Sequence, residues 1–285
     1  MDKQNIEFNK ERDFGEIFNA TFTFISQNFK QLGLAIIYYA LPFLLFISIM
    51  MSMVYKDMLN FSIDPYGSSI GSFINNYLLI ILCYVAGYTI IMATVCGYIS
   101  LYVRHGKDNF TVTDVWEVIK NKSLTILLAF IIGFIMIILG TILLILPGIY
   151  LTISMSMIFF IIVHEDKGFG SALSRSFELT HKSWWWTLLL LLVMNILVSV
   201  VNMIFQIPQW IIVGINTFHK VSGGGVSGFS ALQTILTAIY FIISTILFSL
   251  PFIALSFQYF SIIEKTESPT LLQKIQDIGK DETTE

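Results

Sequence analysis

Long runs of uncharged residues alternate with short charged stretches along the chain. About 20 apolar residues of helix cross a bilayer core, so the runs near 31–55, 75–103, 184–206 and 230–263 each predict one span. The uncharged run 123–163 is about twice as long as a single span, and we expect it to fold back as two. The pattern therefore predicts six transmembrane helices, called segments one to six in chain order.

Proline and glycine residues lie within these runs or at their ends. Pro147 and Gly148 lie inside the double-length run, where a missing amide donor and a permissive backbone favour a break, so we expect the reversal there. Pro208 is predicted to end segment five, and Asp64-Pro65-Tyr66-Gly67 has the residue order of a type I turn after segment one. Pro251 lies inside segment six, which is longer than one straight span, so a kink, a tilt or a protrusion is expected.

Basic residues are distributed unevenly between the predicted loops. Of the 16 lysine and arginine residues, all except Lys56 and Lys220 lie in the two tails or in the loops after segments two and four. Because lysine and arginine are enriched on the cytoplasmic side, both termini are predicted to be cytoplasmic. We therefore expect an N-terminal tail at 1–30, a membrane domain at 31–263, and a C-terminal tail with a short helix at 264–285.

Amphipathic stretches precede segments one, three and five, in the tail 1–30, near 110–121 and near 169–183. A helix of this kind lies in the membrane surface with its apolar face toward lipid. The recurrence predicts three repeats of one unit, a cytoplasmic amphipathic helix followed by a transmembrane hairpin. Two simpler interpretations stay open. The array can arise by chance without a true repeat, and each helix can be only a positional anchor, because amphipathic flanks bind interfaces generically.

The third amphipathic stretch carries the candidate surface contacts. An apolar stripe with Leu173 and Phe177 lies opposite a polar face with Arg175 and Lys182. These two cations are candidates for contacts with anionic lipid headgroups or with a membrane protein partner. Indole rings prefer the headgroup boundary, which three consecutive residues are predicted to mark: Trp184, Trp185 and Trp186.

Neutral polar residues recur at helical spacing in segments five and six. They are Asn195, Ser199, Asn202 and Gln206 in segment five, and Thr237, Ser244 and Gln258 in segment six. An unpaired amide in hydrocarbon costs several kcal/mol, so these side chains are predicted to avoid lipid. They form either a hydrogen-bonded seam between two helices or a polar groove.

Composition assigns the chain to the membrane class. Hydrophobic types make up 55% of the 285 residues and charged types 12%, with a mean hydropathy of +0.77. Soluble domains carry about 25% charged residues. We therefore predict an all-α integral membrane protein that binds the lipid bilayer and no nucleic acid.

Patterns typical of enzymes are absent from the sequence. The four histidines lack metal-ligand spacing, and no phosphate-binding glycine loop is present. The densest polar group, His164-Glu165-Asp166, is interpreted as a solvated boundary cap in preference to a metal or proton site, because a site needs several convergent groups. We expect no catalytic activity, no cofactor and no metal.

Four motifs form a recognisable series: Leu146-Pro147-Gly148-Ile149-Tyr150, Val163-His164-Glu165-Asp166, Ala172-Leu173-Ser174-Arg175-Ser176 and Trp184-Trp185-Trp186. The series resembles bacterial polytopic membrane families typified by the membrane domain fused to some glycerophosphodiester phosphodiesterases. The resemblance implies a multi-pass protein of the bacterial inner membrane. It does not transfer the phosphodiesterase activity, which belongs to a separate soluble barrel in those proteins.

Two functions remain open from the sequence. The first is a non-enzymatic scaffold or accessory subunit that acts through its cytoplasmic amphipathic helices. The second is a facilitator or carrier of a lipid or small amphiphile through a polar groove between segments five and six. The predicted spans contain no carboxylate or histidine to drive proton-coupled transport, which favours the first function.

Overall fold

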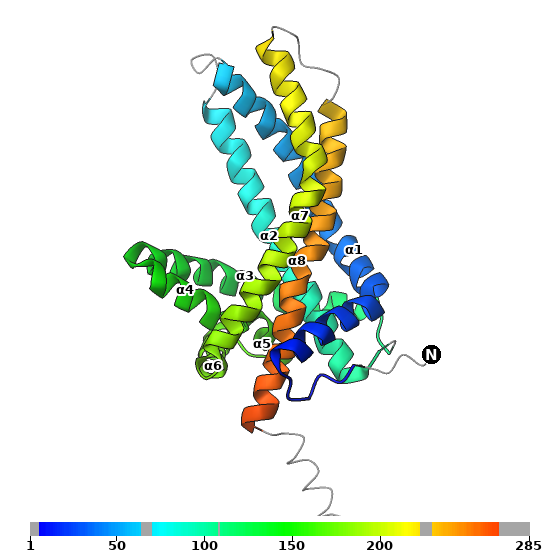
Figure 1. Ribbon diagram of the computed structural model, residues 1–285, viewed down its shortest axis with the longest axis vertical. Coiled ribbons are helices and arrows are strands. Elements are labelled where there is room, and N and C mark those ends of the chain that lie inside the picture. The colour runs from blue at the N-terminus through cyan, green and yellow to red at the C-terminus, as the bar shows by residue number, and fades with distance from the viewer. Residues whose placement is uncertain (1–5, 64–69, 108, 223–229, 268–285) are drawn as a thin grey trace, which may run out of the picture. The chain divides into compact units, whose positions relative to one another are not determined.

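The computed structural model describes residues 6–63, 70–107, 109–222 and 230–267, and in this part of the chain the fold is all-α. The helices are α1 (Phe14–Ile63), α2 (Ile70–His105), α3 (Val112–Leu143), α4 (Ile145–Ser154), α5 (Ile158–His164), α6 (Phe169–His181), α7 (Trp184–Val221) and α8 (Ser230–Glu267) (Figure 1). Within the described residues, 6 helical stretches are long and apolar enough to cross a membrane. The predicted fold class is confirmed, and the chain is a multi-pass membrane protein.

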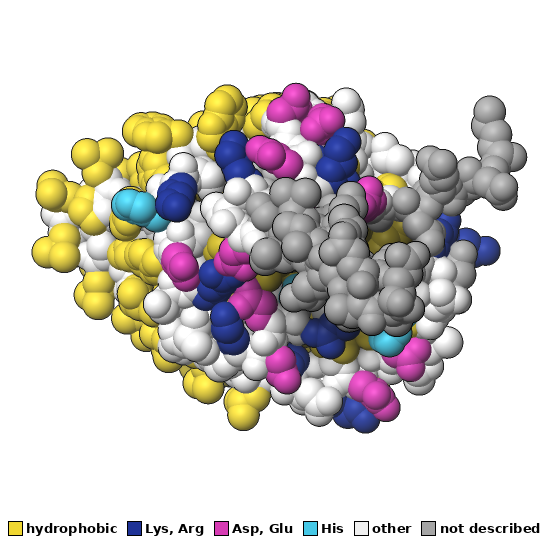
Figure 2. Space-filling model, turned by 90° about the horizontal axis from the view of Figure 1, so that it is seen from below, with side chains coloured by type: hydrophobic (Ala, Val, Ile, Leu, Met, Phe, Trp, Pro, Cys, Tyr) yellow, Lys and Arg dark blue, Asp and Glu magenta, His cyan; other side chains and the backbone are white. Residues whose placement is uncertain are grey.

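The helices divide between two compact units. The first unit contains Met1–Leu32, Ala93–Asn195 and Leu250–Glu285, and the second contains Gly33–Met92 and Ile196–Ser249. Helices α3 to α6 belong wholly to the first unit, whereas α1, α2, α7 and α8 contribute to both. Every charged side chain that the structure describes lies in the first unit, and Figure 2 shows such side chains gathered on one face.

Phe8, which precedes α1, lies at the centre of an aromatic cluster in the first unit. Its ring stacks on Phe257 of α8 with centroids 4.3 Å apart. Phe24 of α1 and Tyr102 of α2 meet Phe8 edge to face, at 5.5 and 5.7 Å. Aromatic pairs add about 0.5–1.5 kcal/mol beyond their area burial. The N-terminal segment therefore packs into the core, a role that its charged composition did not predict.

The predicted amphipathic helices take two structural forms. Those before segments one and three are the first turns of α1 and α3 and run directly into the spans, whereas the one before segment five is a separate helix, α6. The start of α3 is fixed by a capping box, in which the Asp114 carboxylate accepts the Thr111 N–H at 2.7 Å. The three stretches therefore share a position before a span but not one local structure.

The double-length run reverses at Leu144, three residues before the predicted break. Leu144 is extended, with φ −161° and ψ 147°, and lies between α3 and α4. Pro147 lies in the first turn of α4, where a helix needs no amide donor. Gly148 packs against Thr141 of α3. Proline and glycine thus begin the return helix and allow its close approach to α3, and neither residue forms the turn itself.

Prolines inside the long helices do not end them. Pro208 lies within α7, which continues to Val221, so the predicted end of segment five is wrong. Helix α8 likewise runs through the buried Pro251 as one element. Neighbouring helices and hydroxyl side chains can satisfy the freed carbonyls in membrane helices, which explains this tolerance. The predicted turn at 64–67 and the predicted tail helix after Glu267 lie outside the described residues.

Gly148→Ala is expected to destabilise the hairpin of α3 and α4 by about 1–3 kcal/mol, the range for overpacking. A Cβ at position 148 would lie 2.9 Å from the Thr141 Cβ and 3.0 Å from the Thr141 Cα. Gly33→Ala is the matched control, because a Cβ there meets nothing within 4 Å. Thermal unfolding of the detergent-solubilised protein measures both variants. Equal unfolding temperatures would show that the close approach at Gly148 contributes nothing.

Candidate functional site

Helix α6 is held on its inner face by a break in the neighbouring helix. The chain forms turns between α4 and α5, and the Ser154 carbonyl at this break accepts a hydrogen bond from the Ser176 hydroxyl of α6 at 2.7 Å. The Thr180 hydroxyl lies 3.4 Å from the same carbonyl but donates to the Ser176 carbonyl of its own helix at 2.7 Å, and both side chains are fully buried. An unsatisfied buried carbonyl costs about 1–3 kcal/mol. The hydrogen bond at the break between α4 and α5 therefore fixes α6 against these two helices.

The buried face of α6 differs from the predicted apolar stripe. Ala172 and Leu179 complete the buried face together with the two hydroxyl residues. Leu173 and Phe177, on the predicted stripe, are only half-buried. Small side chains allow α6 to approach the broken helix closely, and the larger apolar residues of the predicted stripe stay partly exposed.

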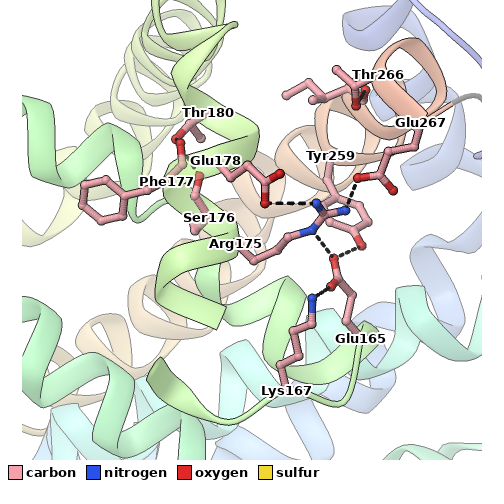
Figure 3. Close-up of polar contacts among 11 residues, drawn as sticks. Glu165, Lys167, Arg175, Ser176, Phe177, Glu178, Thr180, Tyr259, Thr266 and Glu267 are labelled. Carbon is pink, nitrogen blue, oxygen red and sulfur yellow. Dashed lines mark hydrogen bonds and ion pairs between the residues drawn. The ribbon is translucent and has the colours of Figure 1, made fainter. Parts of the chain in front are cut away.

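Arg175 connects α6 to two other elements of the first unit (Figure 3). Its Nε lies 3.4 Å from Oε1 of Glu165, in the loop before α6. Its Nη1 lies 3.3 Å from Oε2 of Glu178 on α6, and its Nη2 contacts Glu267 at the end of α8. One guanidinium thus contacts three carboxylates from three parts of the chain.

Glu165 has further partners in the same group. Its Oε1 accepts the Tyr259 hydroxyl at 2.7 Å, and its Oε2 pairs with Lys167. These residues, together with Arg175, Glu178 and Glu267, are called the Arg175 cluster.

Contacts within the Arg175 cluster stabilise the ionised forms of Glu165 and Arg175. Burial raises the pKa of Glu165, but the hydrogen bonds from Lys167 and Tyr259 and the charge of Arg175 outweigh it and leave the pKa lowered. Burial also disfavours the charged form of Arg175, yet the bond to Glu267 and the charge of Glu165 outweigh it and raise its pKa. Both groups are therefore held in their ionised forms.

The neighbours of Glu165 have partners elsewhere. The Nδ1 atom of His164 lies 3.1 Å from the Ser100 hydroxyl, and its backbone carbonyl accepts a hydrogen bond from Arg104 at 2.6 Å. Asp166 pairs with Lys122 and has φ 58°, in the left-handed region. The side chains of residues 164–166 therefore diverge, each toward its own partners. Among the described residues, no group of three histidine, cysteine or acidic side chains is placed to hold a metal.

The remaining predicted contact residues differ in accessibility. Lys182 is exposed at the end of α6. Trp185 and Trp186 are 75% and 60% exposed at the start of α7. Trp184 is half-buried and stacks on Tyr150 of α4, with centroids 6.0 Å apart. Lys182, Trp185 and Trp186 therefore remain available for outside contacts, whereas Trp184, like Arg175, contacts the protein itself.

In the second unit, amide side chains join α7 to α8. Gln209 donates to the Thr237 hydroxyl at 3.0 Å, and Asn216 donates to the Gln233 side-chain carbonyl at 3.2 Å. Gln209 and Asn216 continue the predicted polar stripe of segment five at helical spacing. Sequence reasoning missed both residues because it ended the segment at Pro208.

The predicted groove residues are divided between the two units. Asn195 and Gln258 belong to the first unit, where Asn195 is exposed and donates to the Leu191 carbonyl of its own helix at 2.8 Å, and Gln258 is buried. The second unit contains Ser199, Asn202, Gln206, Thr237 and Ser244. Ser199 is exposed and Gln206 is half-buried, while the buried Asn202 Oδ1 has no hydrogen-bond partner among the described residues.

Ser244 of the second unit lines a small pocket. The pocket has a volume of about 170 Å³ and is lined by α1, α2 and α8. Aromatic side chains dominate its wall, including Tyr84, Tyr88 and Tyr240. It is therefore an apolar site with a few hydroxyl groups inside a predicted membrane region.

Comparison with known proteins identifies a family. A family model matches residues 42–262, more than half of the chain. The chain belongs to the DUF7847 family. DUF7847 is described as a domain of unknown function, and no curated protein or solved structure matches the chain.

The DUF7847 match covers most of the Arg175 cluster. Glu165, Arg175 and Tyr259 lie inside the matched region, whereas Phe8 and Glu267 lie outside it. The DUF7847 description carries no activity. It also does not mention the membrane domains fused to phosphodiesterases, so that resemblance stays a prediction.

Glu165→Gln is expected to lower the free energy of unfolding by about 2 kcal/mol at pH 7, because it removes a carboxylate that holds charged partners. The contribution is complete above the ordinary carboxyl pKa of about 4.3 and is lost as pH falls through the lowered folded-state pKa. The difference in unfolding temperature between wild type and Glu165→Gln should therefore narrow below about pH 4. Glu7→Gln, at an exposed carboxylate, controls for general charge effects. A difference that stays constant from pH 7 to pH 3 would contradict the assignment.

Proposed function

We propose that the chain is a non-enzymatic multi-pass membrane protein that acts as a scaffold or accessory subunit. Its docking surface is the outer face of α6, formed by exposed residues: Ser171, Ser174, Glu178, His181 and Lys182. The observation that carries this proposal is the anchoring of α6 by Ser176 and Arg175. A helix held on its inner side presents its outer side in one fixed position.

Fixed presentation matters for binding because ordering side chains and loops on association costs free energy. That cost is about 0.5–1.5 kcal/mol for each immobilised flexible side chain. Arg175 connects α6 to the preceding loop through Glu165 and to the end of α8 through Glu267, so the helix backbone is already held in place before any partner binds. A pre-ordered polar helix suits protein docking better than catalysis.

The proposed location is the cytoplasmic membrane of a bacterium, with both termini and α6 on the cytoplasmic side. The support is the distribution of basic residues, because lysine and arginine are enriched in cytoplasmic loops. Lys122, Lys167, Arg175 and Lys182 all lie in the first unit, whose charged side chains gather on the face shown in Figure 2. This face would meet cytoplasmic partners or the anionic headgroups of the inner leaflet.

The hydrogen bonds between α7 and α8 weigh against transport through a groove. The amide groups of Gln209 and Asn216 are bonded to α8 side chains. Interhelical bonds in membranes contribute about 0.6 kcal/mol each on average, and they hold the two helices together. These residues therefore support a seam at this part of α7.

A second candidate function is binding or transfer of a lipid or small amphiphile in the second unit. The pocket of about 170 Å³ beside Ser244 favours it, because its aromatic wall suits an apolar chain and its hydroxyl groups suit a polar end. The unpartnered Asn202 Oδ1 is a further acceptor in this unit.

The docking proposal predicts a specific protein contact at Ser174. A photo-crosslinking residue at position 174, in intact cells, is expected to give one discrete protein adduct. Lys182→Glu should lower the adduct yield at least about fivefold, a loss of about 1 kcal/mol in binding, without lowering the unfolding temperature. Lys30→Glu, at an exposed lysine on α1, is the matched control. An adduct that Lys182→Glu leaves unchanged, or only lipid adducts, would overturn the proposal.

The alternative function predicts an amphiphile in the small pocket. Native mass spectrometry of gently extracted protein should then show a retained molecule that is lost with Ser244→Phe, which fills the pocket. Ser199→Phe at an exposed position is the control. Retention that is equal in both variants would remove the pocket as support for a carrier.

A further inference from the structure

A second polar site in the first unit lies at the end of α2 and the start of α3. It is a cavity of about 450 Å³, called the boundary cleft, within the usual range of about 300–1,000 Å³ for small-molecule sites. Its lining includes Arg104, His105, Glu117, Lys122 and Asp166. This cleft is separate from the outer face of α6, and the proposed function does not use it.

The exposed side chains of α3 place the boundary cleft at headgroup depth. Trp116, next to Glu117 in the chain, is 40% exposed, and tryptophan prefers the headgroup level of a membrane. Leu124, about two turns farther along α3, is 66% exposed and apolar. The cleft therefore lies where the polar surface of the chain meets its lipid-facing surface.

Some charged groups of the boundary cleft already form ion pairs or hydrogen bonds within the protein. Lys122 and Asp166 form an ion pair. The Asp114 carboxylate, also in the lining, accepts the Thr111 N–H and hydroxyl at 2.7 and 2.9 Å as part of the capping box. These contacts leave Lys122, Asp114 and Asp166 less available to a ligand.

Other groups of the cleft keep binding capacity. Arg104 uses Nη2 for the His164 carbonyl, which leaves other guanidinium N–H donors. The Glu117 carboxylate is exposed and has no partner among the described residues. The His105 imidazole adds a further polar ring to the lining. The lining of the cleft therefore contains both a cation and a carboxylate with free binding capacity. This charge pattern disfavours a ligand that carries only negative charge and suits a ligand that carries both charges.

We propose that the boundary cleft binds a zwitterionic phosphodiester headgroup. Arg104 and His105 bind the phosphate, because guanidinium and phosphate form strong charge-assisted hydrogen bonds. Glu117 accepts hydrogen bonds from a primary ammonium group. The headgroup of phosphatidylethanolamine has this chemistry, and so does free glycerophosphoethanolamine.

Lipid competition tests the ligand chemistry. Full-length protein is reconstituted in nanodiscs of equal parts phosphatidylethanolamine, phosphatidylcholine and phosphatidylglycerol, and retained lipid is counted by native mass spectrometry. Wild type should retain phosphatidylethanolamine at least about fivefold over the other two, a difference of about 1 kcal/mol. Equal retention of the three lipids would exclude the lipid as the ligand and leave only the soluble compound to be tested.

Variants assign the two ends of the headgroup. Glu117→Gln should abolish the preference for phosphatidylethanolamine over phosphatidylcholine, whose quaternary ammonium has no N–H to donate. Arg104→Gln should lower retention of all three lipids. Because Arg104 also bonds the His164 carbonyl, its variant is checked by thermal unfolding. Lys120→Gln is the control, at an exposed residue of the same helix outside the lining. A Glu117→Gln variant that behaves like Lys120→Gln would contradict the role of Glu117.

A titration with free glycerophosphoethanolamine distinguishes the source of the headgroup. The protein is held in phosphatidylcholine nanodiscs, and heat of binding is measured for wild type and Glu117→Gln. Retained lipid without binding of the free compound supports the lipid as ligand. Binding of the free compound that Glu117→Gln weakens at least fivefold, about 1 kcal/mol, supports a soluble ligand of the same chemistry. Failure of both assays would overturn the site.

Discussion

The hydrogen bond from the Ser176 hydroxyl to the Ser154 carbonyl is the contact on which the position of α6 in the first unit depends. The return arm of the α3–α5 hairpin is broken between α4 and α5, and a break in an apolar environment leaves backbone groups that need partners. The Ser176 hydroxyl on α6 supplies one of these partners, and the small Ala172 on the same buried face lets α6 come close. The position of α6 therefore follows from the break, and Arg175 then lies within reach of Glu165 and Glu267.

The Arg175 cluster acts mainly by fixing positions. Partly buried ion pairs lose solvation when they form, so their net contribution to stability is modest even where loss of one partner is costly. Their geometry is demanding, however, since Arg175 must meet Glu165, Glu178 and Glu267 at once. An arrangement of this kind selects one placement of α6 among several that its apolar residues would allow. That selection makes the outer face of α6 a defined surface.

Sequence patterns predicted the parts of this structure that depend on local composition. Run length predicted six spans, and amphipathic spacing placed a helix near 169–183, close to the observed Phe169–His181. The predictions failed where tertiary contacts decide the outcome. Pro208 was assigned as an end because a proline removes one donor, yet α7 continues through it. Phe8 is a single apolar residue in a charged segment, so it forms no periodic pattern. Its burial depends on the aromatic residues that it contacts in the folded chain.

The candidate sites show the same division between local pattern and tertiary contact. Residues 164–166 looked like one polar group, but the structure assigns each residue to a different neighbour. Glu165 joins the Arg175 cluster, while the His164 carbonyl and Asp166 bond to Arg104 and Lys122 of the boundary cleft. This short loop therefore belongs to both sites, and a substitution in it would change both together. Lys182 and Glu117 each lie at only one site, so they separate docking at α6 from headgroup binding at α3 where the loop residues cannot.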